Sequence, residues 1–179
     1  MSPDRTVDPP AEPAIAEVFC DGACIGNPGP GGYGVVVRMP GRPVQRDSGG
    51  LSLTTNNQME LTGAIVGLTI AVEAGAKMIR VSTDSEYVVN GMKSWVAGWK
   101  RKGWKTTSGT PVKNQEMWEA LDSLCAGAEV VWHWIPGHAG HVENEECDRM
   151  AVAAARDAAR RPVARPHGAD SRPPIRRRF

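Results

Sequence analysis

The sequence of 179 residues lacks several features that mark whole classes of proteins. It has no run of 18 apolar residues, so we expect no transmembrane helix. Its N-terminus has no basic region followed by an apolar stretch, so we expect no secretory signal peptide. Its four cysteines include no CxxC pair, which disfavours a disulfide framework and is typical of reduced thiols. We therefore expect a cytoplasmic protein.

The two ends of the sequence lack apolar periodicity and are rich in proline, alanine and charge. Residues 1–14 and 157–179 are therefore predicted to be disordered extensions. Residues 15–156 have an ordinary globular composition, and their length suits one domain with a core of its own. We expect this domain to act as a monomer.

Acidic residues are absent from one central segment. Residues 87–114 contain five lysines and one arginine but no aspartate or glutamate, and residues 156–179 contain eight arginines against two aspartates. The rest of the central region is acidic by the same count. An acidic locus beside a basic stripe suits a metal-dependent enzyme that acts on a polyphosphate.

The apolar patterns predict an α/β fold. Strands are predicted over 14–25, 33–39 and 43–53, with a glycine–proline loop between the first two. A long helix is then predicted over 56–75, where Gly75 suits the C-terminal end, and a buried strand over 78–84. One or two short helices, a helix, a strand and a last helix are predicted to follow. This order favours a five-stranded mixed sheet, three antiparallel strands and then two parallel ones, with helices on both faces.

Four acids occupy places that this fold would bring together. Asp21 ends the first predicted strand and Asp84 ends the fourth, so both would emerge side by side if these strands are neighbours. Glu60 lies one turn into the long helix, and Asp148 lies one turn into the last helix. Taken singly, an aspartate at a strand end is more often a turn former or a helix cap.

Four carboxylates share a small site only when cations neutralise them. Hard oxygen ligands favour Mg²⁺, for which Mn²⁺ can substitute. Two such ions about 4 Å apart would bind both the attacking and the leaving oxygen of a phosphodiester. Placement of the four acids therefore predicts a two-metal phosphodiesterase.

Five sequence blocks, in order and spread over residues 15–155, resemble type 1 ribonuclease H of the bacterial ribonuclease HI kind. The blocks are DGAC with GNPGPGGYG at 21–34, TNNQMEL at 55–61, STDSEYV at 82–88, WIPGHAGH at 134–141 and ENEECD at 143–148. The resemblance implies a ribonuclease H-like fold. It also implies an endonuclease that hydrolyses the RNA strand of an RNA–DNA hybrid and leaves 5′-phosphate and 3′-hydroxyl ends.

The resemblance also implies roles for particular residues. The metal ligands would be the four acids, Asp21, Glu60, Asp84 and Asp148. His138 would assist proton transfer or product departure from a mobile loop, although a loop histidine can also be a solvated bystander.

Substrate contacts are expected from two groups of residues. Short polar groups suit the 2′-hydroxyl that distinguishes RNA from DNA, although residues such as Thr55 also cap helices. This first group comprises Cys24, Gly26, Asn27, Thr55, Asn56 and Asn57. A basic, tryptophan-rich arm would bind phosphates and sugars of the DNA strand, although it could be only a hydrophobic anchor with solvated lysines. This second group comprises Trp95, Trp99, Lys100, Arg101, Lys102, Trp104 and Lys105.

Three alternatives remain open at this point. A zinc-binding module could use cysteines and histidines, but their spacing matches no common finger. The candidates for such a module are Cys20, Cys24, Cys147, His133, His138 and His141. A catalytically idle hybrid-binding protein could share the fold. Another nuclease of the wider superfamily, such as a junction resolvase or integrase, could carry the same four acids.

Overall fold

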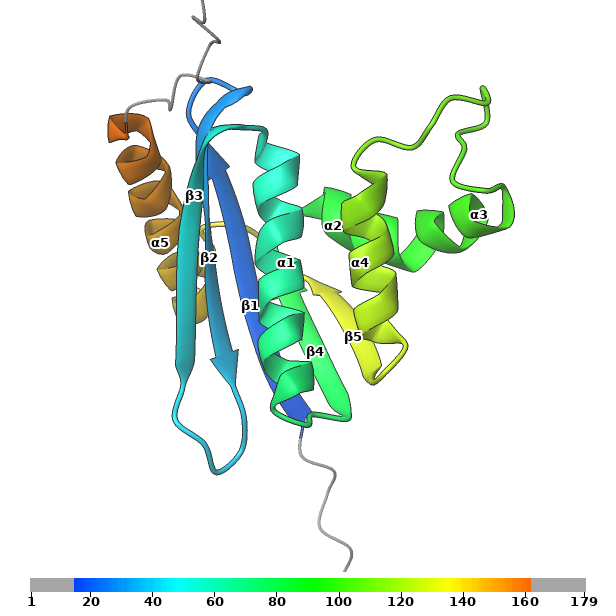
Figure 1. The fold of residues 1–179 in the computed structure, drawn as a ribbon. Coiled ribbons are helices and arrows are strands. Elements are labelled where there is room, and N and C mark those ends of the chain that lie inside the picture. Colours follow the sequence, from blue (N-terminus) through cyan, green and yellow to red (C-terminus); the bar gives the residue numbers. More distant parts are fainter. Residues whose placement is uncertain (1–14, 162–179) are drawn as a thin grey trace, which may run out of the picture.

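The computed structural model describes residues 15–161, which form one five-stranded sheet flanked by helices (Figure 1). The strand order across the sheet is β3-β2-β1-β4-β5. The strands are β1 (Ile15–Cys24), β2 (Gly29–Arg38), β3 (Gln45–Thr54), β4 (Met78–Thr83) and β5 (Glu129–Trp134). The first three strands pair antiparallel, whereas β4 pairs parallel with both β1 and β5. The predicted mixed sheet is confirmed.

Helices cover both faces of this sheet, also as predicted. A side chain at Gly31 of β2 would meet Met59 of helix α1 (Asn56–Glu73). A side chain at the next position, Gly32, would meet Ala154 of helix α5 (Val142–Arg160). Because successive strand residues face opposite sides, α1 and α5 lie on opposite faces. Figure 1 shows α4 (Gln115–Cys125) beside α1.

The loop between β1 and β2 is shorter than the sequence suggests. β1 continues to Cys24 and β2 starts at Gly29, so the glycines that follow belong to the strand rather than to a loop. Asp21 consequently lies inside β1, opposite Gly34, and not at the strand end as expected. The glycines of β2 are needed for close packing against α1 and α5 rather than for chain reversal.

Helix α1 begins and ends as its sequence predicts. Thr55 is the N-cap, and it forms a capping box with Gln58 in which each side chain accepts a hydrogen bond from the other's backbone. Gly75, just past the helix, has a φ of 85°, a left-handed conformation that glycine adopts without steric cost. The buried side of α1 includes Met59 and Leu68, which pack into the core of the sheet.

The predicted short helices form one continuous helical segment, the α2–α3 run, with a π-helical turn in its middle. α2 (Glu86–Asn90) leads into the π-helical segment η1 (Gly91–Trp95), which leads into α3 (Val96–Arg101). A side chain at Gly91 would collide with the ring of Trp118 from α4. The glycine therefore lets this run approach α4 closely.

Helix α5 is longer than predicted. It runs to Arg160, so the expected domain boundary at residue 156 falls inside the helix. The remainder of the predicted C-terminal extension, 162–179, and the predicted N-terminal extension, 1–14, lie outside the described residues. Among residues 15–161, no helix has the length and apolar character that crossing a membrane requires.

The close packing of α5 on β2 yields a stability prediction. A Cβ atom at Gly34 would collide with the backbone carbonyl oxygen of Cys147, which cannot move without displacing α5. We expect Gly34→Ala to reduce the free energy of unfolding by roughly 2 kcal/mol or more, as overpacking does. Urea unfolding in EDTA measures this change.

The matched control is Gly98→Ala in α3, where a Cβ atom meets no heavy atom within 4 Å. That substitution should stabilise the protein by up to about 1 kcal/mol through helix propensity. Equal effects of the two substitutions would contradict the close approach of α5.

Candidate active site

The parallel pairing of β1 with β4 brings two of the predicted acids together. Phe19 of β1 is opposite Ser82 of β4, so Asp21 and Asp84 each follow that pair by two residues. The charge of Asp84 raises the pKa of Asp21 more than any other charged group does. The expectation that these two acids emerge side by side is in agreement with this register.

The two helical acids approach from opposite faces of the sheet. Glu60 is the fifth residue of α1, and Asp148 is the seventh residue of α5, nearly two turns in rather than one. Both carboxylates add to the electrostatic destabilisation of an ionised Asp21. The structure therefore gathers all four predicted acids around Asp21.

Crowding and burial change the acidity of this group. Burial, and then the charges of Asp84, Asp148 and Glu60, raise the pKa of Asp21 to about 7, although a hydrogen bond from the Gly22 N–H opposes the shift. Burial also raises the pKa of Glu60, with a smaller contribution from the charge of Asp84. A divalent cation would relieve this repulsion.

Hydrogen bonds hold Glu60 on both of its oxygens. Asn56 Nδ2 donates to Glu60 Oε1 at 2.8 Å, and Ser85 Oγ donates to Oε2. Ser85 is also the N-cap of α2. The position of this carboxylate is thus linked to the start of two helices.

The donor set suits a hard divalent cation. All four side chains offer carboxylate oxygens, the ligand type that Mg²⁺ and Mn²⁺ prefer. In residues 15–161, no three acids, histidines or cysteines converge closely enough to hold a metal ion together. The acids therefore lie within the range of charge repulsion, and Asn56 and Ser85 donate hydrogen bonds to the two oxygens of Glu60.

The loop that carries His138 lies next to this cluster. A Cβ atom at Gly137 would lie 2.7 Å from Asp84 Oδ2, so the loop backbone touches the acid. His138 itself is exposed and has a φ of 53°, which is uncommon for a residue other than glycine. Strained backbone of this kind is frequent at functional sites.

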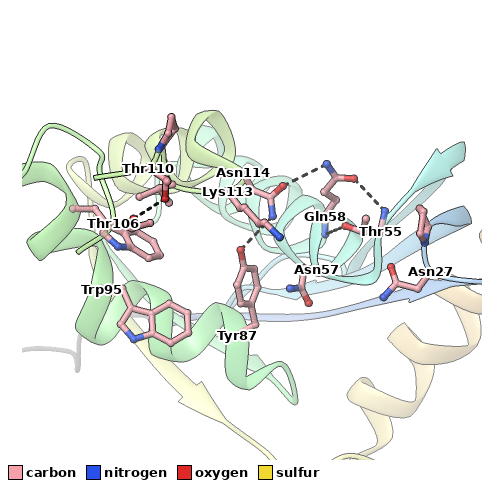
Figure 2. A pocket seen from close by; sticks show the side chains of 14 residues that line it. Asn27, Thr55, Asn57, Gln58, Tyr87, Trp95, Thr106, Thr110, Lys113 and Asn114 are labelled. Carbon is pink, nitrogen blue, oxygen red and sulfur yellow. Dashed lines mark hydrogen bonds between the residues drawn. The ribbon is translucent and has the colours of Figure 1, made fainter. Parts of the chain in front are cut away.

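A cavity of about 860 Å³ lies between the start of α1 and the α2–α3 run. Figure 2 shows Asn27, Thr55 and Asn57 at one end of it, and Trp95 at the other. Trp99 also lines it, and its ring centroid lies 5.7 Å from that of Trp95. Five of the predicted substrate-binding residues therefore share one cavity.

Other predicted substrate residues do not line this cavity. Asn56 lies between the lining residues Thr55 and Asn57, and its backbone N–H donates a hydrogen bond to a third lining residue, at Asn27 Oδ1, at 3.1 Å. Cys24 directs its Sγ toward backbone carbonyls of Gly29 and Thr54. Gly26 is exposed, with a φ of 68° that suits a turn glycine.

The basic arm also divides into separate roles. Lys100 forms an ion pair with Asp122 of α4 at 2.7 Å, an acid that lies outside the acid-free segment. Trp104 packs against the core with a φ of 60°, so it anchors the arm. Arg101 lies with Lys100 on a second groove, on the other side of α3 from the cavity. Lys102 is exposed, and Lys105 forms an isolated bridge with Pro111.

Sequence reasoning missed the centre of the cavity. Asn114 accepts a hydrogen bond from Gln58 at 3.4 Å and donates one to Tyr87 Oη at 3.2 Å (Figure 2). Lys113 supplies the positive charge of the lining. Asn114 has a φ of 58°. In the sequence, an asparagine directly before an amphipathic helix could have indicated a binding residue, but it indicates a helix N-cap equally well.

The zinc alternative has no support in the described residues. Cys20 packs against Gly63 of α1, whereas Cys147 belongs to α5 on the other face of the sheet. Burial raises the pKa of Cys147 to about 12 and also raises that of Cys20 well above its usual range. Neither thiol is poised to become a thiolate ligand.

Four acids that converge on a mixed sheet of this order define a nuclease of the ribonuclease H-like class. The description of the RNase H family matches residues 13–156. The chain is 50% identical over 139 residues to Ribonuclease H of Erwinia tasmaniensis, covering 78% of this chain and 88% of that one. It is 48% identical over 141 residues to Ribonuclease HI of Shewanella oneidensis, covering 79% and 87%. The chain therefore belongs to the RNase H family, in its type 1 bacterial branch.

Solved structures agree with this assignment. LC9-RNase H1, a type 1 RNase H, superposes with a TM-score of 0.71 at 34% identity, covering 85% of this chain and 76% of that one. The N-terminal RNase H domain of a Mycobacterium tuberculosis protein superposes with a TM-score of 0.66 at 29% identity, covering 82% and 96%. The predicted ribonuclease H-like fold is confirmed.

The raised pKa of Asp21 generates a prediction about stability and pH. The folded protein holds this proton up to about pH 7, whereas an aspartate in the unfolded chain releases it near its ordinary pKa of 3.8. Metal-free stability should therefore fall as pH rises from about 4 to 7. Asp21→Asn removes the ionisation, so in EDTA at pH 8 it should increase the free energy of unfolding by roughly 1–3 kcal/mol.

The increase in the free energy of unfolding caused by Asp21→Asn should be smaller at pH 5, because the cost of keeping Asp21 protonated in the fold is smaller there than at pH 8. Urea unfolding at the two pH values measures it, and Asp47→Asn on the exposed part of β3 is the control. A gain that is the same at both pH values would show that Asp21 is not the titrating group.

Proposed function

We propose that this ribonuclease H hydrolyses the RNA strand of RNA–DNA hybrids as an endonuclease, and leaves 5′-phosphate and 3′-hydroxyl ends. The observation that carries the proposal is the convergence of Glu60, Asp84 and Asp148 on Asp21. The relatives named Ribonuclease H and Ribonuclease HI support the activity. LC11-RNase H1, whose structure was solved in complex with an RNA/DNA hybrid, shares the fold with a TM-score of 0.62.

The four acids would hold two Mg²⁺ ions, which Mn²⁺ could replace. When bound, such ions supply a strong nucleophile near neutral pH and stabilise charge on the leaving oxygen. Asp21 would supply the central carboxylate, and Asp84, Glu60 of α1 and Asp148 of α5 would supply the others. Asn56 and Ser85 orient Glu60 through hydrogen bonds to its two oxygens.

His138 would act on protons rather than on metal. Its exposed imidazole lies one residue from Gly137, which touches Asp84. From that loop it can donate a proton to the departing 3′-oxygen or help the product to leave. An imidazole changes charge near neutral pH, which suits either step.

The cavity would bind the hybrid beside the cleavage centre. Asn27, Thr55 and Asn57 offer short polar groups that suit the 2′-hydroxyl or a phosphate. The tryptophan pair at the far end, Trp95 and Trp99, offers flat apolar faces against which sugars of the DNA strand can pack. Lys113 supplies charge, and Arg101, Lys102 and Lys105 would add attraction from the exposed side of the arm.

The remaining assignments concern the whole chain. All four acids come from one chain, which supports action as a monomer. We assign catalysis to the folded domain that begins at residue 15 and includes all of α5, and we place the protein in the cytoplasm.

Cleavage assays test the activity and the metal site together. The wild type should cut labelled RNA–DNA hybrid, leave RNA–RNA and DNA–DNA duplexes intact, and lose all activity in EDTA. Asp84→Asn should reduce turnover by more than about 100-fold while hybrid binding survives. Glu86→Gln removes one exposed carboxylate two residues away and should keep nearly full activity. If Asp84→Asn kept a tenth of wild-type turnover, Asp84 would not be a required ligand.

The role of His138 predicts a different kinetic pattern. His138→Ala should lower turnover by roughly 10- to 1,000-fold and leave hybrid affinity nearly unchanged, because a proton donor acts mainly on the chemical step. His133→Ala, at an exposed position of β5, is the control. Loss of affinity with normal turnover would instead identify the loop as a binding element.

A further inference from the structure

Asp84 is held by one continuous segment, residues 134–144, which joins β5 to α5. Trp134 Nε1 donates a hydrogen bond to the backbone oxygen of Asp84 at 3.0 Å. Asn144 Nδ2 donates to its carboxylate oxygen Oδ2 at 3.3 Å. Gly137 lies against the same Oδ2, close enough that a Cβ atom would be 2.7 Å from it. One carboxylate oxygen is therefore engaged by the chain.

Asn144 is unusual among the residues that contact this site. Its side chain is 2% exposed, and in the described part of the chain its Oδ1 has no hydrogen-bond partner. If the side-chain amide were rotated by 180°, its Oδ1 would face the Asp84 carboxylate and repel it, so Oδ1 would still have no hydrogen-bond donor. The orientation with Nδ2 toward Asp84 is thus the favourable one.

Folding alone does not explain an asparagine at this position. Asparagine is a poor helix former, yet Asn144 is the third residue of α5 and is not its N-cap. A buried amide oxygen without a partner destabilises a fold, whereas an apolar side chain of the same size would not. The polar group is retained at a cost in stability, and within residues 15–161 the one side-chain hydrogen bond of Asn144 goes to Asp84.

We propose that Asn144 is a positioning residue, which orients the carboxylate of Asp84 for cation binding. Asn144 donates to Oδ2, and the Gly137 backbone lies close to the same oxygen, whereas Oδ1 accepts no side-chain hydrogen bond from the described residues. The inference rests on the proposed role of Asp84 as a metal ligand. It adds that the segment bearing His138 also sets the geometry of the metal site.

The test compares folding with metal binding in the whole chain. Asn144→Leu keeps the number and branching of the side-chain heavy atoms and removes the polar groups, so it should fold with stability equal to or above that of the wild type in EDTA. Titration of MgCl₂ followed by calorimetry, and by the rise in unfolding temperature, should show Mg²⁺ binding about 10-fold weaker or more. Asn144→Ala should show the same loss of affinity with a less stable fold.

Ala151→Gly is the matched control, because it destabilises α5 at a buried position that makes no hydrogen bond to Asp84. It should lower the unfolding temperature and leave Mg²⁺ affinity unchanged. If Asn144→Leu binds Mg²⁺ within twofold of the wild type, the positioning role is wrong. If Mg²⁺ fails to bind the wild type, or binds Asp84→Asn equally well, the proposed metal site itself is wrong.

Discussion

Repulsion between Asp21 inside β1 and Asp84 just after β4 is the constraint on which the rest of the structure depends. Asp21 is buried beside Asp84, and both Glu60 and Asp148 add negative charge to it, so its pKa rises to about 7. The fold tolerates this arrangement because α1 and α5 pack closely on the two faces of the sheet around it. The repulsion destabilises the metal-free fold only around Asp21. A bound cation would remove that repulsion, so the relief would strengthen cation binding.

Close backbone packing is what lets a small domain bring four acids together. Gly32 and Gly34 of β2 carry no side chain, so α5 can lie directly on the strand. This packing places Asp148 of α5 near enough to raise the pKa of Asp21. Ion pairs of Arg38 with Glu143 and of Arg46 with Glu146 tie the same helix to β2 and β3 at the surface. The glycines therefore affect the acid cluster through helix placement, and Gly34 also lies opposite Asp21 in the pairing of β1 with β2.

The order of strands and helices could be predicted because the spacing of apolar residues shows which face of each element is buried. The four acids could be predicted because each stands at a particular place in that order. The sequence could not show that the glycines after Gly29 lie within β2, because glycine signals a loop and a close approach equally well. Lys100 was assigned to phosphate binding from its neighbours in sequence, yet its partner, Asp122, comes from α4. The hydrogen bonds of Asn114 and Asn144 depend on residues 27 to 60 positions away, which no local pattern encodes.

The short helix α2 connects the acid cluster to the neighbouring cavity. Its N-cap, Ser85, donates a hydrogen bond to Glu60, and two residues later Tyr87 lines the cavity and packs against Trp118 with ring centroids 5.1 Å apart. Trp118 is fully buried, so this aromatic contact ties α2 to the core. Because less than one helical turn separates Ser85 from Tyr87, the cavity cannot shift relative to the acids without breaking that packing. A hybrid seated in the cavity would therefore present its RNA strand to the acids at a fixed distance, and cleavage position would follow from the rigidity of α2.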